Sequence, residues 1–146
     1  MHEKKVGGLH MDDALQFVVN RSVMMLIYKQ PFLDWLCSHN PDASKNFTLE
    51  DLRFDTDTFL IPKFYDPYEL VEWVEKRWRV LFESILFDWT TDESMWPKNR
   101  TLEMFREWFI MDIHSIAWDL VDEPLKIEDM GTDEEVNEDE PDSLIH

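Results

Sequence analysis

The chain has 146 residues, a length typical of one domain, and a formal net charge of −18. Its aromatic share of 14% argues against a chain that is disordered throughout. The excess of carboxylates argues against direct binding to nucleic acid or to an anionic membrane, because such binding relies on cationic side chains that contact phosphates. No apolar run approaches the roughly 20 residues that span a bilayer. The single cysteine, Cys37, excludes an internal disulfide framework, so we expect a reducing, cytoplasmic setting.

The negative charge is concentrated towards the C-terminal end. Residues 122–146 contain eleven acidic residues and one lysine, for a net charge of −10, whereas residues 1–121 contain 21 acidic and 13 basic residues, for −8. A segment so poor in apolar residues is predicted to be disordered. Its charge is suited to a basic protein partner.

The first elements are an arm, a strand and a helix. Residues 1–19 are predicted to form an N-terminal arm or a short helix, of which 11–19 is weakly amphipathic. Ser22–Lys29 is a continuous apolar run of strand length, which predicts a buried strand. A helix is expected to begin at Gln30-Pro31, because proline is tolerated at the first helical position.

A second strand and a long helix follow. Thr48 can cap a short helical turn, and Thr58–Phe64 reads as a strand. Pro62 cannot donate a hydrogen bond to a neighbouring strand, which favours an edge position or a bulge. Asp66-Pro67 is the clearest helix start, and the apolar spacing predicts one helix to about residue 89.

Residues 92–120 combine a rigid turn, a short helix and a strand. Trp96-Pro97 fixes an extended turn, and either Asn99 or Thr101 can cap the helix that follows. From Ile110 the period becomes two, with Asp112, His114 and Trp118 among the residues on one side. Both sides are substantially apolar, so we expect a strand that is covered on both faces.

The order of elements is βα, a short helical turn, then βααβ. It predicts an α+β fold in which residues 20–121 form one domain with a three-stranded mixed sheet and packed helices. Residues 1–19 and 122–146 are then additions to that domain. The order of the strands in the sheet stays open.

The candidate ligand-binding residues come from the turn and the last strand. Lys98, Asn99 and Arg100 precede a helix, where free backbone amides favour an anion. His114 and Asp112 could act together as a general base or as ligands, and Trp118, on the same side, is the third candidate ligand-binding residue of this strand. An ordinary capped helix entry, with Arg100 paired to Asp92 or Glu93, and a histidine held by a hydrogen bond explain the same residues. The turn lacks the glycines of a nucleotide-binding loop.

Other candidate sites are weaker. Trp73 and Trp96 are the tryptophans expected at the surface, where they could bind a protein partner. Cys37 and His39 are too few for a structural zinc site, which needs about four ligands. We therefore predict no metal, no cofactor and no catalytic residue.

One stretch resembles a known family. The motifs Asp92-Glu93-Ser94 and Trp96-Pro97-Lys98-Asn99-Arg100-Thr101, with the earlier runs 29–35 and 60–62, are similar to those of a family of small, uncharacterised prokaryotic proteins. The resemblance covers about residues 20–121. It implies one domain over that range and no activity that can be carried over.

These features favour a non-enzymatic protein–protein interaction module that binds a basic partner. The alternative is a small protein or enzyme that binds an anionic ligand near His114 and the 96–101 turn. Mimicry of a nucleic acid ranks last, because more than half of the charge excess lies in the C-terminal segment. The sequence leaves the oligomeric state open.

Overall fold

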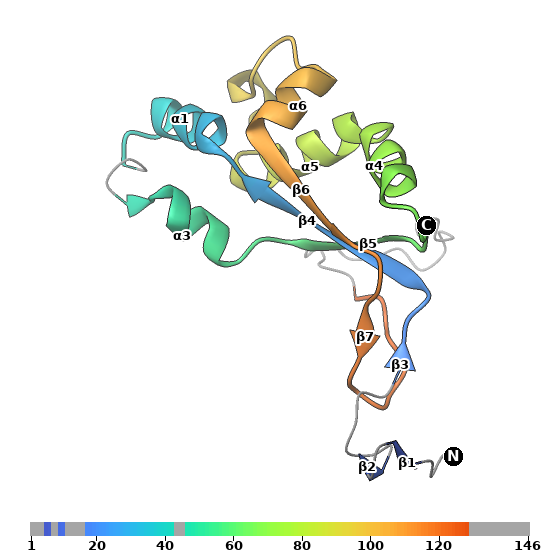
Figure 1. Cartoon of the computed structure of the whole chain (residues 1–146). Coiled ribbons are helices and arrows are strands. Elements are labelled where there is room, and N and C mark those ends of the chain that lie inside the picture. Colours follow the sequence, from blue (N-terminus) through green and yellow to red (C-terminus); the bar gives the residue numbers. More distant parts are fainter. Residues whose placement is uncertain (1–4, 7–8, 11–16, 43–45, 129–146) are drawn as a thin grey trace, which may run out of the picture.

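The computed structural model describes residues 5–6, 9–10, 17–42 and 46–128. Its centre is a three-stranded sheet in the order β5 (Thr58–Pro62), β4 (Arg21–Tyr28) and β6 (Phe109–His114) (Figure 1). The prediction of an α+β domain is confirmed.

The prediction of a mixed sheet is wrong, because β5 and β6 both run antiparallel to β4. Thr58 pairs with Met25, and Phe109 pairs with Tyr28. Each connection therefore returns the chain to the end at which β4 finishes, and this return makes each pair antiparallel. The edge position that Pro62 favours is confirmed, since β5 is an outer strand.

Four helices, α1, α3, α4 and α6, begin where the sequence predicts. Thr48 and Asp51 form a capping box, and Asp66 accepts a hydrogen bond from the amide of Tyr68. Thr101, the second of the two candidate caps, accepts from the amide of Met104. The helices are α1 (Gln30–His39), α3 (Leu49–Phe54), α4 (Pro67–Glu75), α5 (Trp78–Trp89), the 3-10 turn η2 (Glu93–Met95) and α6 (Leu102–Trp108).

The prediction of one helix from Pro67 to about residue 89 is wrong, because the chain breaks between α4 and α5. The amide of Arg77 donates to Val74 O at 2.8 Å, three residues back. The carbonyl of Trp73, which a continuous helix would pair with that amide, accepts instead from Arg77 Nη1 at 3.0 Å. The guanidinium also stacks at 3.6 Å from the centre of the Trp73 ring. The arginine side chain thus satisfies the carbonyl that the break leaves free.

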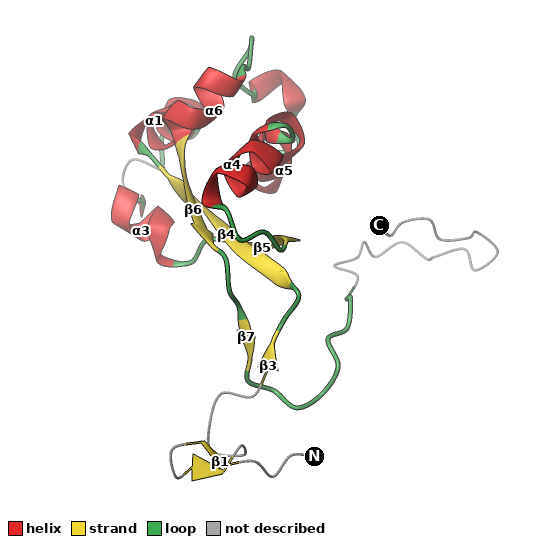
Figure 2. Cartoon of the chain, turned by 45° about the vertical axis from the view of Figure 1, so that its right-hand side comes forward, coloured by secondary structure: helices red, strands yellow, loops and turns green. Residues whose placement is uncertain are grey.

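The core lies between one face of the sheet and the helices. Helices α1, α4, α5 and α6 lie together on one side of the sheet (Figure 2). Met24 and Leu26 of β4 point into this layer, as do Ile61 and Phe109 of the outer strands, and all four are buried. Phe32 is fully buried at the centre of an aromatic cluster, and its ring contacts those of Tyr28, Trp35, Trp89, Trp108 and Phe109.

A short ribbon projects from the sheet. β3 (Phe17–Val18) pairs antiparallel with β7 (Trp118–Asp119) and extends away from the helices (Figures 1 and 2). The strand expected across residues 110–120 is therefore two strands, β6 and β7. The helix considered for residues 11–19 is contradicted at Phe17–Val18, and residues 11–16 lie outside the described residues.

The described parts of the two chain ends contain one further strand pair. This pair, β1 (Lys5–Val6) with β2 (Leu9–His10), precedes the ribbon. Residues 122–128 form no helix or strand and are exposed, and residues 129–146 of the predicted disordered segment lie outside the described residues. Within the described ranges, no helix is long and apolar enough to cross a membrane.

Candidate interaction surface

The sheet has a second face that the core does not cover, which we call the open face. It comprises Val23, Met25 and Ile27 of β4, Leu60 of β5 and Ile110 of β6, none of which belongs to the core cluster. Leu60 is 55% exposed and Ile110 is 45% exposed. The expectation that the last strand is covered on both faces is therefore wrong. β6 is an outer strand and its residues with even numbers point to the open face.

The open face differs in charge from the rest of the molecule. The three strands contain one arginine, Arg21, and one aspartate, Asp112, so their formal net charge is zero. The described α-helices have a formal net charge of −7, to which α4 contributes −3 and each of the other four −1. A near-neutral apolar surface is thus set apart from acidic helices.

The ribbon and its flanking residues 17–19 and 116–121 form what we call the arm, which leaves the sheet through a bulge. Val18 pairs with Trp118, and Val23 pairs with His114. Between these two pairs, one side of the ribbon advances five residues, from 18 to 23, and the other advances four, from 114 to 118. One extra residue on one strand bends a ribbon and increases its twist. At this point the buried Ser22 hydroxyl donates to Ser115 O at 3.0 Å. This hydrogen bond links the two segments of the chain across the bulge.

The arm presents an apolar side next to acidic residues. Exposure alternates along this segment: residues 114, 116, 118 and 120 are exposed, and residues 115, 117 and 119 are half-buried. Ile116 is 52% exposed, Trp118 49% and Leu120 62%. Asp119 lies within the same segment, and the acidic residues 122–123 follow directly. Large exposed apolar side chains that lie together are typical of protein-binding surfaces.

His114 and Asp112 lie together on the open face. His114 Nε2 is 3.0 Å from Asp112 Oδ1, and the side chains are 58% and 42% exposed. The prediction that Asp112 and His114 share one side of the strand agrees with the pairing of β6, whereas Trp118 lies in the separate strand β7, beyond a bend at residue 115. A pair this exposed contributes at most about 1 kcal/mol to stability.

The 96–101 turn lies elsewhere. It precedes α6, whereas His114 is at the far end of β6, the strand that follows α6. Five residue steps of strand, at roughly 3.3 Å each, separate Phe109 at the start of β6 from His114. The structure therefore does not bring Lys98, Asn99 and Arg100 together with Asp112, His114 and Trp118.

Arg100 is already paired within the fold. Its Nη2 donates to Glu83 Oε2 at 2.7 Å and its Nη1 donates to Pro97 O at 2.8 Å. Glu83, which is distant in the sequence, takes the place expected for Asp92 or Glu93. The nearby Lys98 and Asn99 are exposed, and Asn99 adopts a left-handed backbone with φ of 57°. Only Lys98 is left as an unneutralised cation among the described residues of this turn.

The two tryptophans expected at the surface differ. Trp96 is 7% exposed, so that prediction is wrong, because its indole N–H donates inward to Thr90 O at 3.0 Å. Trp73 is half-buried beneath the guanidinium of Arg77. Trp118, which was grouped with the ligand-binding residues, is the tryptophan with the exposed ring on the arm.

A small hollow opens between α1 and the end of α5. Its volume is about 190 Å³, and its lining residues are Trp35, Leu36, His39, Asn40, Trp89, Thr90 and Met95. Pockets that bind small ligands are usually about 300–1,000 Å³. The indole of Trp35 donates to Met95 O at 3.0 Å, so the polar group of one wall is already satisfied.

The part of the chain that the structure describes contains no candidate metal site. No three histidine, cysteine or carboxylate side chains in that part are placed to hold an ion together. Cys37 is a free, half-buried thiol on α1 that packs against the core.

No protein-family model, curated protein sequence or solved structure matches this chain. The resemblance on the 92–101 motif therefore stays a prediction.

Reasoning from the sequence missed the open face of β4. Both sides of the run 22–29 carry apolar residues. The alternation of polar and apolar residues therefore could not show which side the helices cover. Leu60 was a weak indication of an exposed face, since it lies two residues before Pro62, which favours an edge position for its strand.

Proposed function

We propose that this chain is a non-enzymatic interaction module that binds a basic protein partner through the arm. One observation carries the proposal: Ile116, Trp118 and Leu120 are exposed together on an arm that leads directly into the acidic segment 122–146.

The two parts of this surface have different physical roles. A large aromatic side chain that becomes buried is the usual centre of a binding interface, so Trp118 is the expected anchor. The acidic segment raises the rate of encounter with a positively charged partner and selects against acidic ones. The hydrogen bond from the Ser22 hydroxyl to Ser115 O restrains the base of the arm. This restraint reduces the conformational entropy that the arm loses when a partner binds.

Affinity capture from the native cell extract, read by mass spectrometry, tests the proposal. Four proteins are compared: the full chain, a chain ending at Val121, Trp118→Ala and Phe87→Ala. Phe87 lies on α5 and is 53% exposed, which matches the 49% exposure of Trp118. Circular dichroism checks that each variant is folded.

We expect a basic protein to be retained by the full chain and by Phe87→Ala, and to be lost with Trp118→Ala. Without residues 122–146 it should bind more weakly, and with less dependence on salt, because fewer charge pairs form. Equal retention by all four proteins, or a partner with no basic surface, contradicts the proposal.

A further inference from the structure

We infer that the open face binds a second copy of this chain and forms a two-fold symmetric dimer. This inference concerns the sheet and not the arm, so it goes beyond the proposed function.

The open face has the character of one half of a sheet-on-sheet interface. Val23, Met25 and Ile27 run along its centre, with Leu60 on one side and Ile110 on the other. Two such faces pack at a separation of about 10 Å, with their strands within about 30° of one another. Association would remove the exposed parts of these side chains from water.

Charge favours a second copy over a basic protein at this face. Two chains of net charge −18 repel one another, and the described α-helices contribute −7 of that charge. The strands of the sheet add nothing to that repulsion, because β4, β5 and β6 have no net charge. A basic partner would meet only Asp112 there, already paired with His114.

The two charged residues of this face suit two-fold symmetry. The guanidinium of Arg21 donates to Asn20 O at 3.0 Å, and no carboxylate of the described residues is within ion-pair distance of it. Val23 lies midway between Arg21 and Met25, the residue that pairs with Asp112. A two-fold axis that lies between the two sheets and crosses the strands at Val23 therefore places each Arg21 opposite Met25 of the second copy, next to Asp112 on the adjacent strand. Such self-complementarity is what a two-fold interface requires.

The first test is the molar mass of the full chain by light scattering and sedimentation over a concentration series. A three-stranded face is smaller than the roughly 800 Å² per partner of a standard interface, so we expect reversible association. The mass should rise towards twice the 17.7 kDa of one chain. Leu60→Glu should stay monomeric. Val80→Glu, at a 69% exposed position on α5, should dimerise normally.

The second test is a charge exchange. Arg21→Asp and Asp112→Arg should each weaken the dimer about tenfold or more, and the two changes combined should restore it.

Three results would overturn the inference: a monomer at every concentration, a dimer unaffected by Leu60→Glu, or a combined variant as weak as the single ones. Each result leaves capture of a basic partner by the arm unaffected, so the two proposals fail separately.

Discussion

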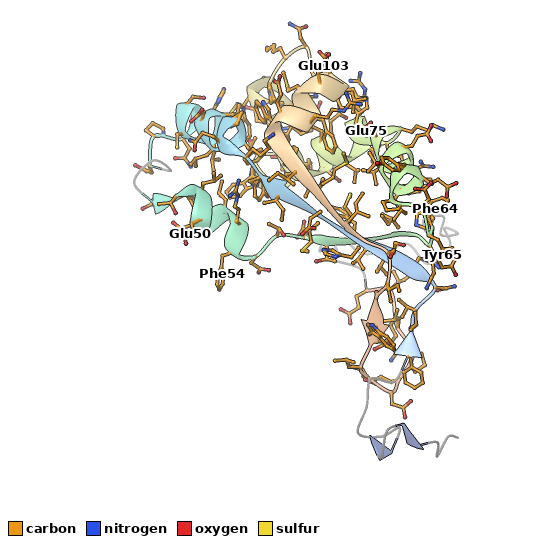
Figure 3. The ribbon with its side chains drawn as sticks, in the orientation of Figure 1. Glu50, Phe54, Phe64, Tyr65, Glu75 and Glu103 are labelled. Carbon is orange, nitrogen blue, oxygen red and sulfur yellow. The ribbon has the colours of Figure 1, made fainter. Side chains whose placement is uncertain are left out.

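Arg106 of α6 binds Glu75 at the end of α4 through one edge of its guanidinium. Nε and Nη2 each donate to a different carboxylate oxygen of Glu75 at 2.7 Å, across 31 residues of sequence (Figure 3 labels Glu75). Glu75 lies four residues before Arg79, a spacing that favours an ion pair on a continuous helix, but Arg79 Nη1 lies 3.8 Å from Glu83 Oε2 instead. The hydrogen bonds from Arg106 lower the pKa of Glu75, although partial burial opposes them.

Glu75→Gln is expected to lower the melting temperature near pH 7 by a few degrees, because it removes the charge that Arg106 binds. The pKa of Glu75 is lower in the folded chain than the usual 4.5. The stabilisation is therefore present above pH 4.5 and is lost as the pH falls through the folded-state pKa. The difference between the two proteins should disappear in strong acid. Glu72→Gln, on the exposed side of α4, should show no such dependence, and a constant difference at all pH values contradicts this account.

Tyr28 accepts a hydrogen bond from the indole of Trp89 at 3.1 Å. Tyr28→Phe leaves that N–H without its acceptor and should lower the free energy of unfolding by about 1 kcal/mol. Burial raises the pKa of Tyr28 above 10.0, with smaller contributions from the charges of Asp57 and Asp88, while the bond from Trp89 acts in the opposite direction.

The free energy of unfolding at alkaline pH should also depend on Tyr28. Its contribution is complete below pH 10 and is lost as the pH rises through the higher folded-state pKa. Absorbance titration at alkaline pH should show a late phenolate that Tyr28→Phe lacks. A difference between the two curves that is centred at the ordinary pKa of 10.0 would count against the burial of Tyr28.

Phe32 is the most connected ring of the core. Phe32→Ala should reduce the free energy of unfolding by about 3–5 kcal/mol, because it removes a fully buried ring and leaves a cavity among five aromatic neighbours. Phe54 is the control: it is 89% exposed and points away from the body at the end of α3 (Figure 3). Phe54→Ala should change stability by less than about 0.5 kcal/mol in urea unfolding.

Asn99 has a left-handed backbone, with φ of 57°. Asn99→Ala should cost about 1 kcal/mol, because a β-carbon without a compensating polar group is unfavourable there. Asn99→Gly should be as stable as the native chain or more so, since glycine adopts this conformation freely. Thermal unfolding distinguishes them, and equal losses for both variants would show that the side chain of Asn99 matters for another reason.

Most helix starts could be predicted because their causes are local. The carboxylate of Asp66 and the hydroxyls of Thr48 and Thr101 bind amides two or three residues ahead, so a few residues specify each cap. The break after Glu75 escaped prediction because apolar spacing continues through it. The break is visible only in the structure, where the amide of Arg77 donates to Val74 O and its guanidinium donates to Trp73 O.

The candidate site was predicted in part. Asp112 and His114 share one side of β6 because alternation along an extended chain is also local, whereas Trp118 lies in the separate strand β7. Their distance from Lys98 and Arg100 depends on the course of α6 and β6. The pairing of Arg100 with Glu83 depends on how α5 packs beside the turn.

The sequence by itself determined the α+β class, most helix starts, the edge position of β5 and the uneven distribution of charge. These follow from residues within one or two turns of one another and from composition. Only the tertiary structure decided that β4 is central, that both neighbours are antiparallel and that one face of the sheet is open. Those features depend on contacts between residues tens of positions apart. Because both sides of β4 and β6 are apolar, burial energy alone did not distinguish the covered side from the open one.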